Sequence, residues 1–279
     1  MTVKEAINLF QCHQRSNVKQ KTINSYAYPL QRFRIQYGER PLESFTPDEL
    51  FTFLENLNRN HAKSTRRLRY AQIKSFFTFI IEKGGLDTKN PCHAPLLAKT
   101  FRMPRQIPRK ILDRETVDEM VYGTSSARDR LIIELQARCG LRIGELLRLR
   151  VSDISERRLT IQEPKSGKEA EIAFMPEQIA NRVAEFVKGN SLQSHDRLFP
   201  LCYSAARSLI RRLGAKLNTV VSPHDLRRYS ATYASRNGIP LEIVSKVILR
   251  HQDLKTTQVY LGKVSEGEAI RWMDILHGK

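Results

Sequence analysis

The chain is 279 residues long, with a formal net charge of +18 at pH 7 and with 41% hydrophobic and 27% charged residues. This length suits two domains of ordinary size, and the composition is that of a globular protein without the roughly 18 consecutive apolar residues that a membrane span needs. A surface this basic attracts a polyanion, so we expect DNA or RNA as the partner; no membrane is expected, because the basic stretches lack a long apolar face with aromatic anchors.

The cysteines and the amino terminus narrow the class further. Four cysteines are scattered without a C-x-x-C pair, at Cys12, Cys92, Cys139 and Cys202. This spacing argues against a zinc site and a disulfide framework, so we expect no metal, no cofactor and a reducing cytoplasm. A basic protein with DNA as its partner would there be associated with the nucleoid. The first residues lack the basic start, apolar run and cleavage site of a secretory signal, and they predict the first turns of a helix instead.

Residues 1–95 are predicted to form a small helical domain. After Thr22, a candidate cap, apolar residues recur at three- and four-residue intervals, as on one helix face. A second helix is expected after Thr46, where a cap, a proline and two acidic residues stand in order. A third helix follows Ser64 and ends at Gly84-Gly85.

Positive charge is concentrated in three windows that contain no acidic residue. They lie between Glu55 and Glu82, from Thr88 to Leu112 and from Arg197 to His224. Three such windows predict an extended contact with a phosphate backbone, although any one of them also fits a solvated helix face. The candidate DNA-contacting residues are Lys63, Arg66, Arg67, Arg69, Lys74, Arg102 and Arg105.

Residues 96–111 are predicted to be a basic linker that joins the helical domain to a second domain, residues 112–279. The surrounding stretch from Asn90 to Pro108 contains four prolines, no helical periodicity and only basic charge. A linker of this length and charge would lie along a phosphate backbone while joining two bodies on opposite sides of a duplex.

The second domain is predicted to be mainly α-helical with a small antiparallel β-sheet. Residues 158–174 alternate polar and apolar on both sides of a turn-like P-K-S-G-K, which is typical of a β-hairpin. Lys165 and Lys168 lie at its tip, on an arm that would place an ammonium group into a site from outside.

Short segments of this domain carry residues suited to phosphate chemistry. Arg142 stands in the first turn of a predicted helix. His224 and Arg227 lie three residues apart after the cap Ser222, so both point to one side of a helix start whose free amides favour a phosphate. Single residues of these kinds usually have structural roles, and the prediction depends on their conjunction. Two further candidates follow, His251 and Tyr260.

The sequence resembles the tyrosine recombinase (phage integrase) family from about residue 112 to its end. The blocks GLRIGELLRLRVSDI, EPKSGKEAEI, PHDLRRYSATY and RHQDLKTTQVY match the family's motifs in the same order. The first domain is similar to the family's core-binding, SAM-like domain in size, position and pattern. The last block reads L-R-H where the family usually has L-G-H, so Arg250 would contact either backbone or a neighbouring protomer.

The resemblance implies a role for each matching residue. Tyr260 would attack a DNA phosphodiester and become joined to the 3′ phosphate. Lys165 would protonate the departing 5′ oxygen, with Lys168 as the open alternative because the turn departs from the family's usual pattern. His224 would manage the tyrosine proton or brace the phosphate. The non-bridging oxygens would be held by Arg142, Arg227 and His251, and the site would be supported from behind by Glu145 and Asp153.

Physical chemistry makes such a site reasonable without a metal. A free tyrosine has a pKa near ~10, so at pH 7 only about one in a thousand is phenolate, and recovering that fraction would take roughly 4 kcal/mol. Two guanidinium groups and an ammonium supply this electrostatically and also stabilise the charge that builds on the phosphoryl oxygens. The phosphotyrosine keeps the energy of the broken bond, so a DNA hydroxyl reseals it without ATP.

The segment after Tyr260 predicts a short apolar helix. It either packs on its own domain or, as the resemblance favours, docks onto the next subunit to build a ring of four on two DNA duplexes. The apolar residues concerned are Ile270, Trp272, Met273, Ile275 and Leu276.

The preferred function is therefore site-specific recombination by a compact, two-domain enzyme of the Xer type or by the integrase of a small mobile element. A type IB topoisomerase-like nicking and closing enzyme and a non-catalytic DNA-binding regulator are the alternatives. An accessory protein or a partner recombinase is compatible with the sequence, and the DNA target is not readable from it.

Overall fold

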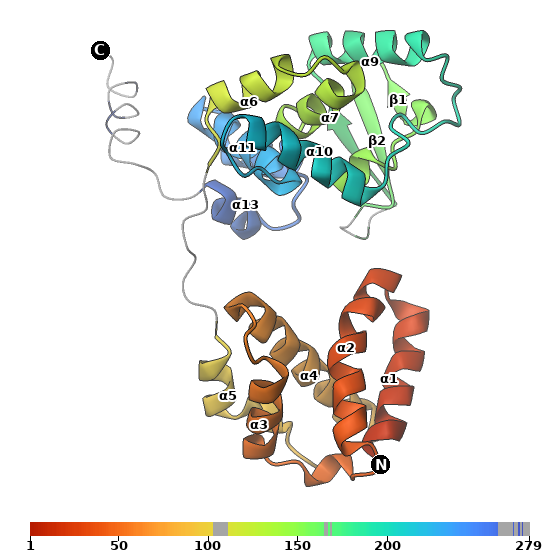
Figure 1. The fold of residues 1–279 in the computed structure, drawn as a ribbon, viewed down its shortest axis with the longest axis vertical. Helices are drawn as coiled ribbons and strands as arrows, with labels where there is room; N and C mark the ends of the chain where they lie inside the picture. Colours follow the sequence, from red (N-terminus) through yellow and green to blue (C-terminus); the bar gives the residue numbers. More distant parts are fainter. Residues whose placement is uncertain are drawn as a thin grey trace. The chain divides into compact units, whose positions relative to one another are not determined.

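The computed structural model describes residues 1–102, 111–164, 167, 169–261, 270, 273 and 275, with Val259 and Tyr260 described by their backbone alone. The chain divides into two compact units, Met1–Ile107 and Pro108–Lys279. The first is drawn in red to yellow and the second in green to blue (Figure 1). Within the described residues, no helix is both long and apolar enough to cross a membrane.

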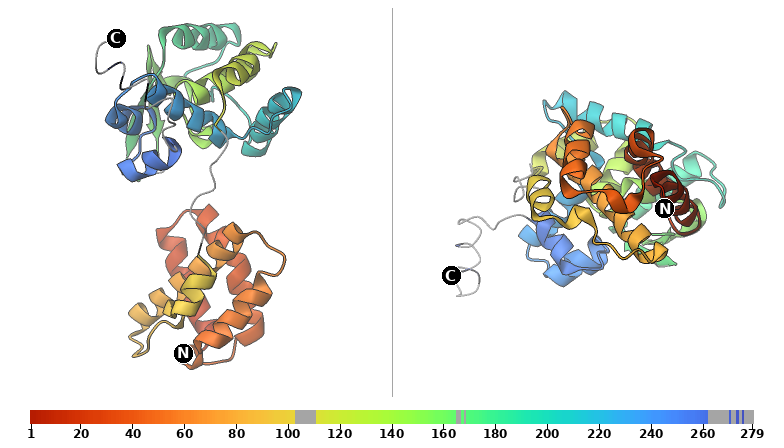
Figure 2. Two further views of the ribbon diagram at one scale, coloured as in Figure 1. Left: turned by 90° about the vertical axis from the view of Figure 1, so that its left-hand side faces the viewer. Right: turned by 90° about the horizontal axis from the view of Figure 1, so that it is seen from below.

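The described part of the first unit contains helices and no strands (Figure 2). Helix α1 begins with a capping box between Thr2 and Glu5, as the helical start predicted for the amino terminus requires. Helix α2 begins two residues before the candidate cap Thr22, after the N-cap Lys19. The elements are α1 (Val3–Asn17), α2 (Gln20–Tyr37), the 3-10 turn η1 (Leu42–Ser44), α3 (Pro47–Leu57), α4 (Lys63–Gly84), the 3-10 turn η2 (Pro91–His93) and α5 (Pro95–Thr100).

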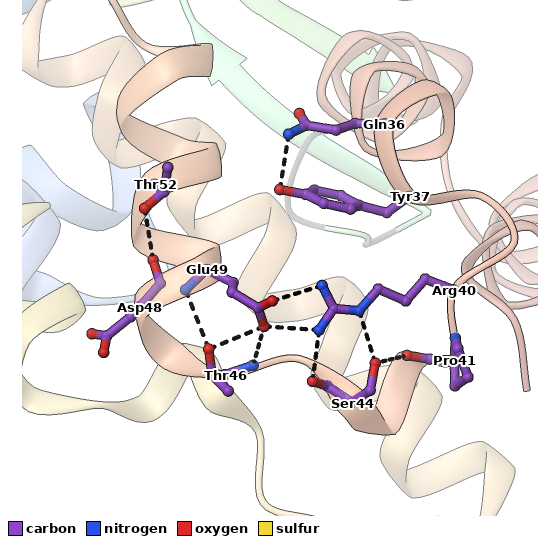
Figure 3. A network of polar contacts seen from close by, with 9 residues as sticks. All are labelled: Gln36, Tyr37, Arg40, Pro41, Ser44, Thr46, Asp48, Glu49 and Thr52. Atoms are coloured by element: carbon purple, nitrogen blue, oxygen red, sulfur yellow. Dashed lines mark hydrogen bonds and ion pairs between the residues drawn. The ribbon is translucent and has the colours of Figure 1, made fainter.

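The connection from α2 to α3 is held by one arginine and one glutamate (Figure 3). The two terminal nitrogens of Arg40 contact Glu49 Oε1 and Oε2 at 2.7 and 2.9 Å, and its Nε donates to Ser44 Oγ at 2.9 Å. Glu49 also accepts the backbone N–H of Thr46 at 3.0 Å, completing the predicted cap of α3. The hydrogen bond from Arg40 and those from Thr46 lower the pKa of Glu49 to about 2.

The sequence assigned residues 96–111 to the linker, but the structure places the first part of that stretch in the first unit. Helix α5 begins at Pro95 and covers the start of this stretch up to Thr100, with Leu97 fully buried and Phe101 only 3% exposed. The Phe101 ring stacks on Tyr70 of α4 with centroids 5.3 Å apart, and Tyr70 Oη donates to Cys92 O at 2.8 Å. With these contacts the described part of the first unit reaches Arg102, and residues 103–110 lie outside the described residues.

The second unit is mainly helical with a three-stranded antiparallel sheet, so the predicted fold class is confirmed. The predicted hairpin is β2 paired with β3, in a register that sets Arg158 opposite Phe174 and Gln162 opposite Ala170. The elements are α6 (Arg114–Tyr122), α7 (Ala127–Ala137), α8 (Ile143–Leu146), the 3-10 turn η3 (Val151–Asp153), β1 (Ile154–Ser155), β2 (Arg158–Gln162), β3 (Ala170–Phe174), α9 (Glu177–Gly189), α10 (Tyr203–Lys216), α11 (Pro223–Arg236), α12 (Leu241–Ile243), the π-helix η4 (Val244–Ile248) and α13 (Leu254–Leu261).

Helix α7 lies at the centre of this unit and is buried from Leu131 to Ala137. Helix α11 packs against α7, and α13 packs against α11 (Figure 1). The π-helix η4 packs against both α11 and strand β3. This arrangement brings the turn after α7, the start of α11, the end of η4 and α13 together.

Candidate active site

Arg227 is the most deeply placed of the candidate residues, with 1% of its surface exposed. One terminal nitrogen donates to Gly140 O in the turn after α7, and the other donates to Leu249 O at the end of η4. Gly140 adopts a left-handed backbone with φ of +63°, and a Cβ there would lie 2.7 Å from Ile248 O. Only glycine fits this close approach, and its carbonyl fixes one side of the Arg227 guanidinium.

Arg142 stands at the N-cap of α8 and is held by Glu145 one turn later. The Arg142 backbone N–H donates to Glu145 Oε2 at 2.9 Å, and its Nη1 lies 2.6 Å from Glu145 Oε1. The Arg142 side chain is 27% exposed, whereas that of Glu145 is 2% exposed. The carboxylate is therefore inside and the guanidinium faces outward, in reach of a ligand.

Glu145 has a second partner, Arg250, whose Nη2 lies 2.8 Å from Glu145 Oε2. Burial alone would raise the pKa of Glu145, but the charge of Arg250 and the hydrogen bonds from Arg142 outweigh it and hold the pKa below its ordinary value. Glu145 therefore stays ionised and fixes two arginines at once. The supporting role expected of Glu145 stays a prediction, which these contacts favour.

His251 is fixed through a short chain of hydroxyl groups. Its Nδ1 lies 2.9 Å from Thr257 Oγ1, which donates to Ser245 Oγ at 2.8 Å, and its backbone N–H donates to Ser245 O at 2.9 Å. Both hydroxyl residues are fully buried, Ser245 on the π-helix and Thr257 on α13. A π-helix is rare and is found frequently at functional sites.

The pKa of His251 is set by burial and by the charged groups around it. Burial lowers its pKa to about 4, assisted by the positive charges of Arg227, Arg142 and Arg250 and by a smaller electrostatic interaction with His224. The ring is therefore neutral at pH 7. Four candidate residues from distant parts of the sequence thus meet in one place, together with Arg250.

His224 occupies the first turn of α11, where the sequence predicted a capped helix start. Ser222 and Asp225 form the capping box, with the Ser222 backbone N–H 2.9 Å from Asp225 Oδ2. The second oxygen of Asp225 lies 2.8 Å from Arg228 Nη1. The carboxylate is thus engaged at the cap and with Arg228, next to the arginine of the site, Arg227.

The candidate nucleophile and the candidate lysines are located only in part. Tyr260 lies on α13, one turn after the buried Thr257, and its side chain is outside the described residues. Lys165 and Lys168 also lie outside them, between strands β2 and β3. The hairpin closes on their turn with a hydrogen bond from the Glu163 backbone N–H to Glu169 O at 3.3 Å.

Asp153 makes local contacts. Its Oδ2 accepts the backbone N–H of Arg150 at 2.9 Å, and its Oδ1 accepts from Gln162 Nε2 at 3.3 Å. These bonds brace the turn η3 against strand β2, which leads to Lys165. Any support that Asp153 gives to the site therefore passes through the hairpin.

Three residues of the site were not predicted: Arg250, Ser245 and Thr257. From the sequence, Arg250 was expected to contact either backbone or a neighbouring protomer. In the structure it contacts its own chain, with Nη1 3.0 Å from Ile248 O and Nη2 on Glu145. Thr257 belongs to the T-T pair of the last block, so the signal for it was present in the sequence.

The candidate DNA-contacting residues of the first unit fall into two groups, those that pack within the unit and those that line a cavity. Arg66 pairs with Glu55, and Arg69 donates to Leu57 O at 2.6 Å, so both already hold α4 to α3 and the loop after it. Lys63 is exposed, and Arg105 lies outside the described residues. The second group lines a cavity of about 530 Å³ between α4 and the end of α5, whose basic residues are Arg67, Lys74 and Arg102.

Comparison with known proteins places the chain in a family. Residues 110–266 match the Phage integrase family, and residues 8–84 match the phage integrase N-terminal SAM-like domain. The first match alone covers more than half of the chain, which therefore belongs to the phage integrase family.

Within that family the chain is a tyrosine recombinase of the Xer-like type. It is 28% identical to the tyrosine recombinase XerA of Thermococcus kodakarensis over 251 residues, which cover 86% of this chain and 83% of that protein. It is 27% identical to XerD of Halalkalibacterium halodurans over 259 residues, 86% of each chain. A 33% match to XerA of Saccharolobus solfataricus spans about half of either chain, 54% and 51%.

Solved structures share the fold at low sequence identity. The chain matches the Tn1549 transposon integrase in complex with transposon right-end DNA with a TM-score of 0.77 at 17% identity over the whole of both chains. It matches a lambda integrase dimer bound to a core site with a TM-score of 0.76 at 19% identity, over 95% of this chain and 97% of that one. The comparisons favour recombination over the nicking and closing enzyme and over the regulator.

Proposed function

We propose that this recombinase cleaves DNA by attack of Tyr260 on a phosphodiester, which leaves a 3′-phosphotyrosine, and that reversal of the step by a new 5′ hydroxyl joins the exchanged strands. The observation that carries this proposal is the convergence of Arg142, Arg227, His224 and His251 around one point, beside the helix that carries Tyr260. In the reaction the tyrosine oxygen–phosphorus bond forms as the 5′ oxygen–phosphorus bond breaks, so no bond energy is lost.

The two arginines suit the non-bridging oxygens of the phosphate. Gly140 O and Leu249 O are neutral acceptors, and they orient the Arg227 guanidinium without cancelling its charge. Arg142 is anchored by a buried carboxylate and keeps an exposed face. Groups fixed in advance need no reorganisation when negative charge builds on the phosphoryl oxygens, which is the main source of electrostatic catalysis.

His251 changes its role when the phosphate binds. The Thr257 hydroxyl donates to Ser245, so Nδ1 of the neutral ring donates to Thr257 and Nε2 accepts. A bound phosphate places negative charge against the same positive groups that lower the pKa of His251, so the pKa rises and Nε2 takes up a proton. The protonated ring then donates to a non-bridging oxygen, and His224 is left to accept the tyrosine proton.

The lysine of the hairpin turn completes the reaction as the general acid. Lys165 is preferred and Lys168 is the alternative, and both belong to the arm formed by β2 and β3. An ammonium group there protonates the departing 5′ oxygen, which would otherwise leave as a poor alkoxide.

The first unit binds the duplex and takes no part in the cleavage reaction. We assign backbone contacts to Lys63, Arg67, Lys74 and Arg102, because these side chains are exposed or line the cavity beside α5. Arg66 and Arg69 shape this surface through their contacts with α3. Arg105 and the rest of the linker would follow the backbone between the two units.

The segment after Tyr260 docks onto a second copy in this proposal, and four copies assemble on two duplexes. The chain shares its fold with a lambda integrase tetramer bound to a Holliday junction, with a TM-score of 0.73 at 18% identity. The exposed Ile270, Met273 and Ile275 supply the apolar surface. We place the assembly on the nucleoid in the cytoplasm, with an accessory or partner recombinase as an additional component.

A suicide DNA substrate tests the cleavage step, because its nicked strand diffuses away and traps the covalent adduct. We expect an adduct with the wild type and none with Tyr260→Phe. The control is Tyr122→Phe, an exposed tyrosine of α6 that is 64% exposed and packs under Arg130. No adduct from the wild type on any cognate site would overturn the proposal, and so would an adduct that persists in Tyr260→Phe.

A substrate with sulfur in place of the 5′ bridging oxygen identifies the general acid. A thiolate leaves without protonation, so this substrate restores cleavage in the variant that lacks the general acid and in no other. We expect rescue of Lys165→Ala, whereas Lys168→Ala should cleave the ordinary substrate. The opposite pattern would assign the role to Lys168.

Truncation after Gly262 tests the docking of the tail. We expect covalent cleavage to survive and strand exchange between two duplexes to be lost. Exchange at the wild-type rate would show that the tail has no part in assembly.

A further inference from the structure

Arg250 adopts a backbone conformation that residues with side chains rarely adopt. Its φ is +51°, in the left-handed region. A residue with a Cβ is held there only when its surroundings determine the conformation, and such positions cluster at active sites. Glycine would occupy this position without strain, so the arginine side chain must contribute something that glycine lacks.

The Arg250 side chain is 3% exposed and joins two buried carboxylates. Its Nη2 lies 2.8 Å from Glu145 Oε2, and its Nε lies 3.6 Å from Glu171 Oε2. Nη1 also donates to Ile248 O at 3.0 Å. The guanidinium plane is thus fixed from three sides.

The two carboxylates come from different parts of the site. Glu145 holds Arg142 at the start of α8. Glu171 lies on strand β3, opposite Ile161, and its side chain is 8% exposed. Strand β3 follows directly after the turn that contains the two candidate lysines, and it packs against the π-helix η4.

We propose that Arg250 is a positioning residue of the cleavage reaction, which locks the Arg142–Glu145 pair and the lysine-bearing hairpin to the segment that carries His251. This inference rests on the proposed function. Because Arg250 precedes His251 in the chain, one guanidinium sets the spacing between the phosphate-binding arginine, the histidine and the arm of the general acid. The hairpin is then held at a fixed distance from the phosphate.

The bridge also sets the charge state of the site. The groups that face His251 are Arg227 and His224 from α11, Arg142 from α8, and Arg250. Those that face Glu145 are Arg142 and Arg250. Removing the positive charge of Arg250 raises the pKa of Glu145, which must be ionised to hold Arg142, so the acid limb of the cleavage rate moves to higher pH. The pKa of His251 rises as well, because Arg250 is one of the charges that lower it.

Single-turnover cleavage of the suicide substrate across pH, with the full chain, tests the proposal. We expect Arg250→Gly to fall roughly 10- to 100-fold in rate, because small misplacements of positioned groups have effects of this size. The acid limb should move to higher pH while the affinity for uncleaved DNA stays the same. Arg250→Lys, which keeps the charge but not the two-sided reach, should restore the pH limb and leave the rate low.

Glu171→Gln separates the two arms of the bridge. It loosens the hairpin and leaves Arg250 on Glu145, so we expect a lower rate with the acid limb unchanged. The pKa of His251, followed by NMR without DNA, should rise in Arg250→Gly and stay near the wild-type value in Arg250→Lys. This NMR measurement does not require an active enzyme.

Arg182→Ala is the matched control. Arg182 and Arg130 hold the buried carboxylate of Glu134, as Arg250 and Arg142 hold that of Glu145. We expect comparable loss of stability without a shift of the acid limb. The inference is overturned if Arg250→Gly cleaves with the wild-type rate and pH limb, or if Arg182→Ala moves the limb equally. If Arg250→Gly does not fold, the cleavage rates and pH limbs of Arg250→Lys and Glu171→Gln test the inference in its place. An inactive wild type would instead overturn the proposed function.

Discussion

The two units of this recombinase use arginine in opposite ways. In the first, the side chains of Arg66 and Glu55 form an ion pair while 31% and 40% exposed. In the second, those of Arg250 and Glu145 form one while 3% and 2% exposed. The first arrangement suits many weak contacts along a backbone, and the second suits one phosphate in one orientation.

The difference follows from the dielectric environment. An ion pair near the surface contributes about 0–1 kcal/mol and is screened by salt, whereas removing one partner of a buried pair costs about 3–5 kcal/mol because the other charge is left uncompensated. Substitutions in the first unit should therefore act on DNA affinity and its salt dependence. Those in the second should act on stability and on cleavage.

Arg227→Ala should show the largest effect. It leaves the buried Leu249 O without its donor, leaves Gly140 O with only the 3.5 Å contact from Arg250 Nη2, and removes a charge from the proposed phosphate site. We expect cleavage to fall by at least ~100-fold and the free energy of unfolding to fall by about 2–4 kcal/mol. Suicide-substrate cleavage and urea denaturation measure these effects. Arg227→Lys should cleave at a rate between those of the wild type and Arg227→Ala. A wild-type rate for Arg227→Ala would show that Arg227 is not part of the site.

Gly140→Ala tests the backbone that holds this arginine. With φ at +63° and a Cβ 2.7 Å from Ile248 O, we expect a loss of about 2–3 kcal/mol and slower cleavage, because the carbonyl that orients Arg227 must move. Gly85→Ala is the control: its φ is +61°, but the Cβ would meet open space, so strain alone should cost about 1 kcal/mol. Equal losses in both proteins would show that the close approach at Gly140 does not matter.

The sequence predicted the elements whose signal is local. Thr46 and Ser222 predict the caps of α3 and α11, and the alternation around the P-K-S-G-K turn predicts the hairpin. Helix α5 was missed because it is a single short segment between prolines, stabilised by the packing of Leu97 and Phe101. Helix α8 ends already at Leu146. Soon after it, Leu149 O accepts a backbone hydrogen bond from Leu198, a distant contact that no local pattern predicts.

The site was predictable where a motif names the residue and hidden where the contact is distant. Arg142, His224, Arg227 and His251 followed from their blocks. The pairing of Arg250 with Glu145 joins residues 105 apart, and an arginine gives no sign of a left-handed backbone. The neutral state of His251 likewise depends on burial, which no single block contains.

The stability of the second unit should depend on pH through His251. Burial and the nearby positive groups lower its pKa from 6.5 to about 4, so between these values the unfolded chain binds more protons than the folded one. Stability is then fully present above about pH 6.5 and is lost as the pH falls through about 4. Because the ring is partly exposed, we expect roughly 1–2 kcal/mol.

Urea denaturation at pH 7 and at pH 4.5, with His251→Asn as the reference, measures this contribution. The difference between the two proteins should shrink at the lower pH. The pKa of Glu145 is held below its ordinary value of 4.5, and this carboxylate is present in both proteins, so its own titration cancels in the difference between them. A difference independent of pH would show that His251 is not held neutral.

The smallest effects belong to the first unit, and they distinguish arginines that hold α4 from those that we propose to contact DNA. Arg67 is exposed, lines the cavity beside α5 and has no side-chain partner among the described residues. We expect Arg67→Ala to weaken DNA binding a few-fold and to reduce the slope of log affinity against log salt by ~0.9, the value for one phosphate contact.

Arg66→Ala should weaken binding differently, because it leaves Glu55 unpaired beside the DNA surface. The added negative charge lowers affinity for every sequence, and Arg66→Ala/Glu55→Ala should recover most of it with the wild-type salt slope. Filter binding across salt concentrations separates the two cases. A slope lowered by ~0.9 in the double variant would place Arg66 on a phosphate, and the division between structural and DNA-facing arginines of α4 would then fail.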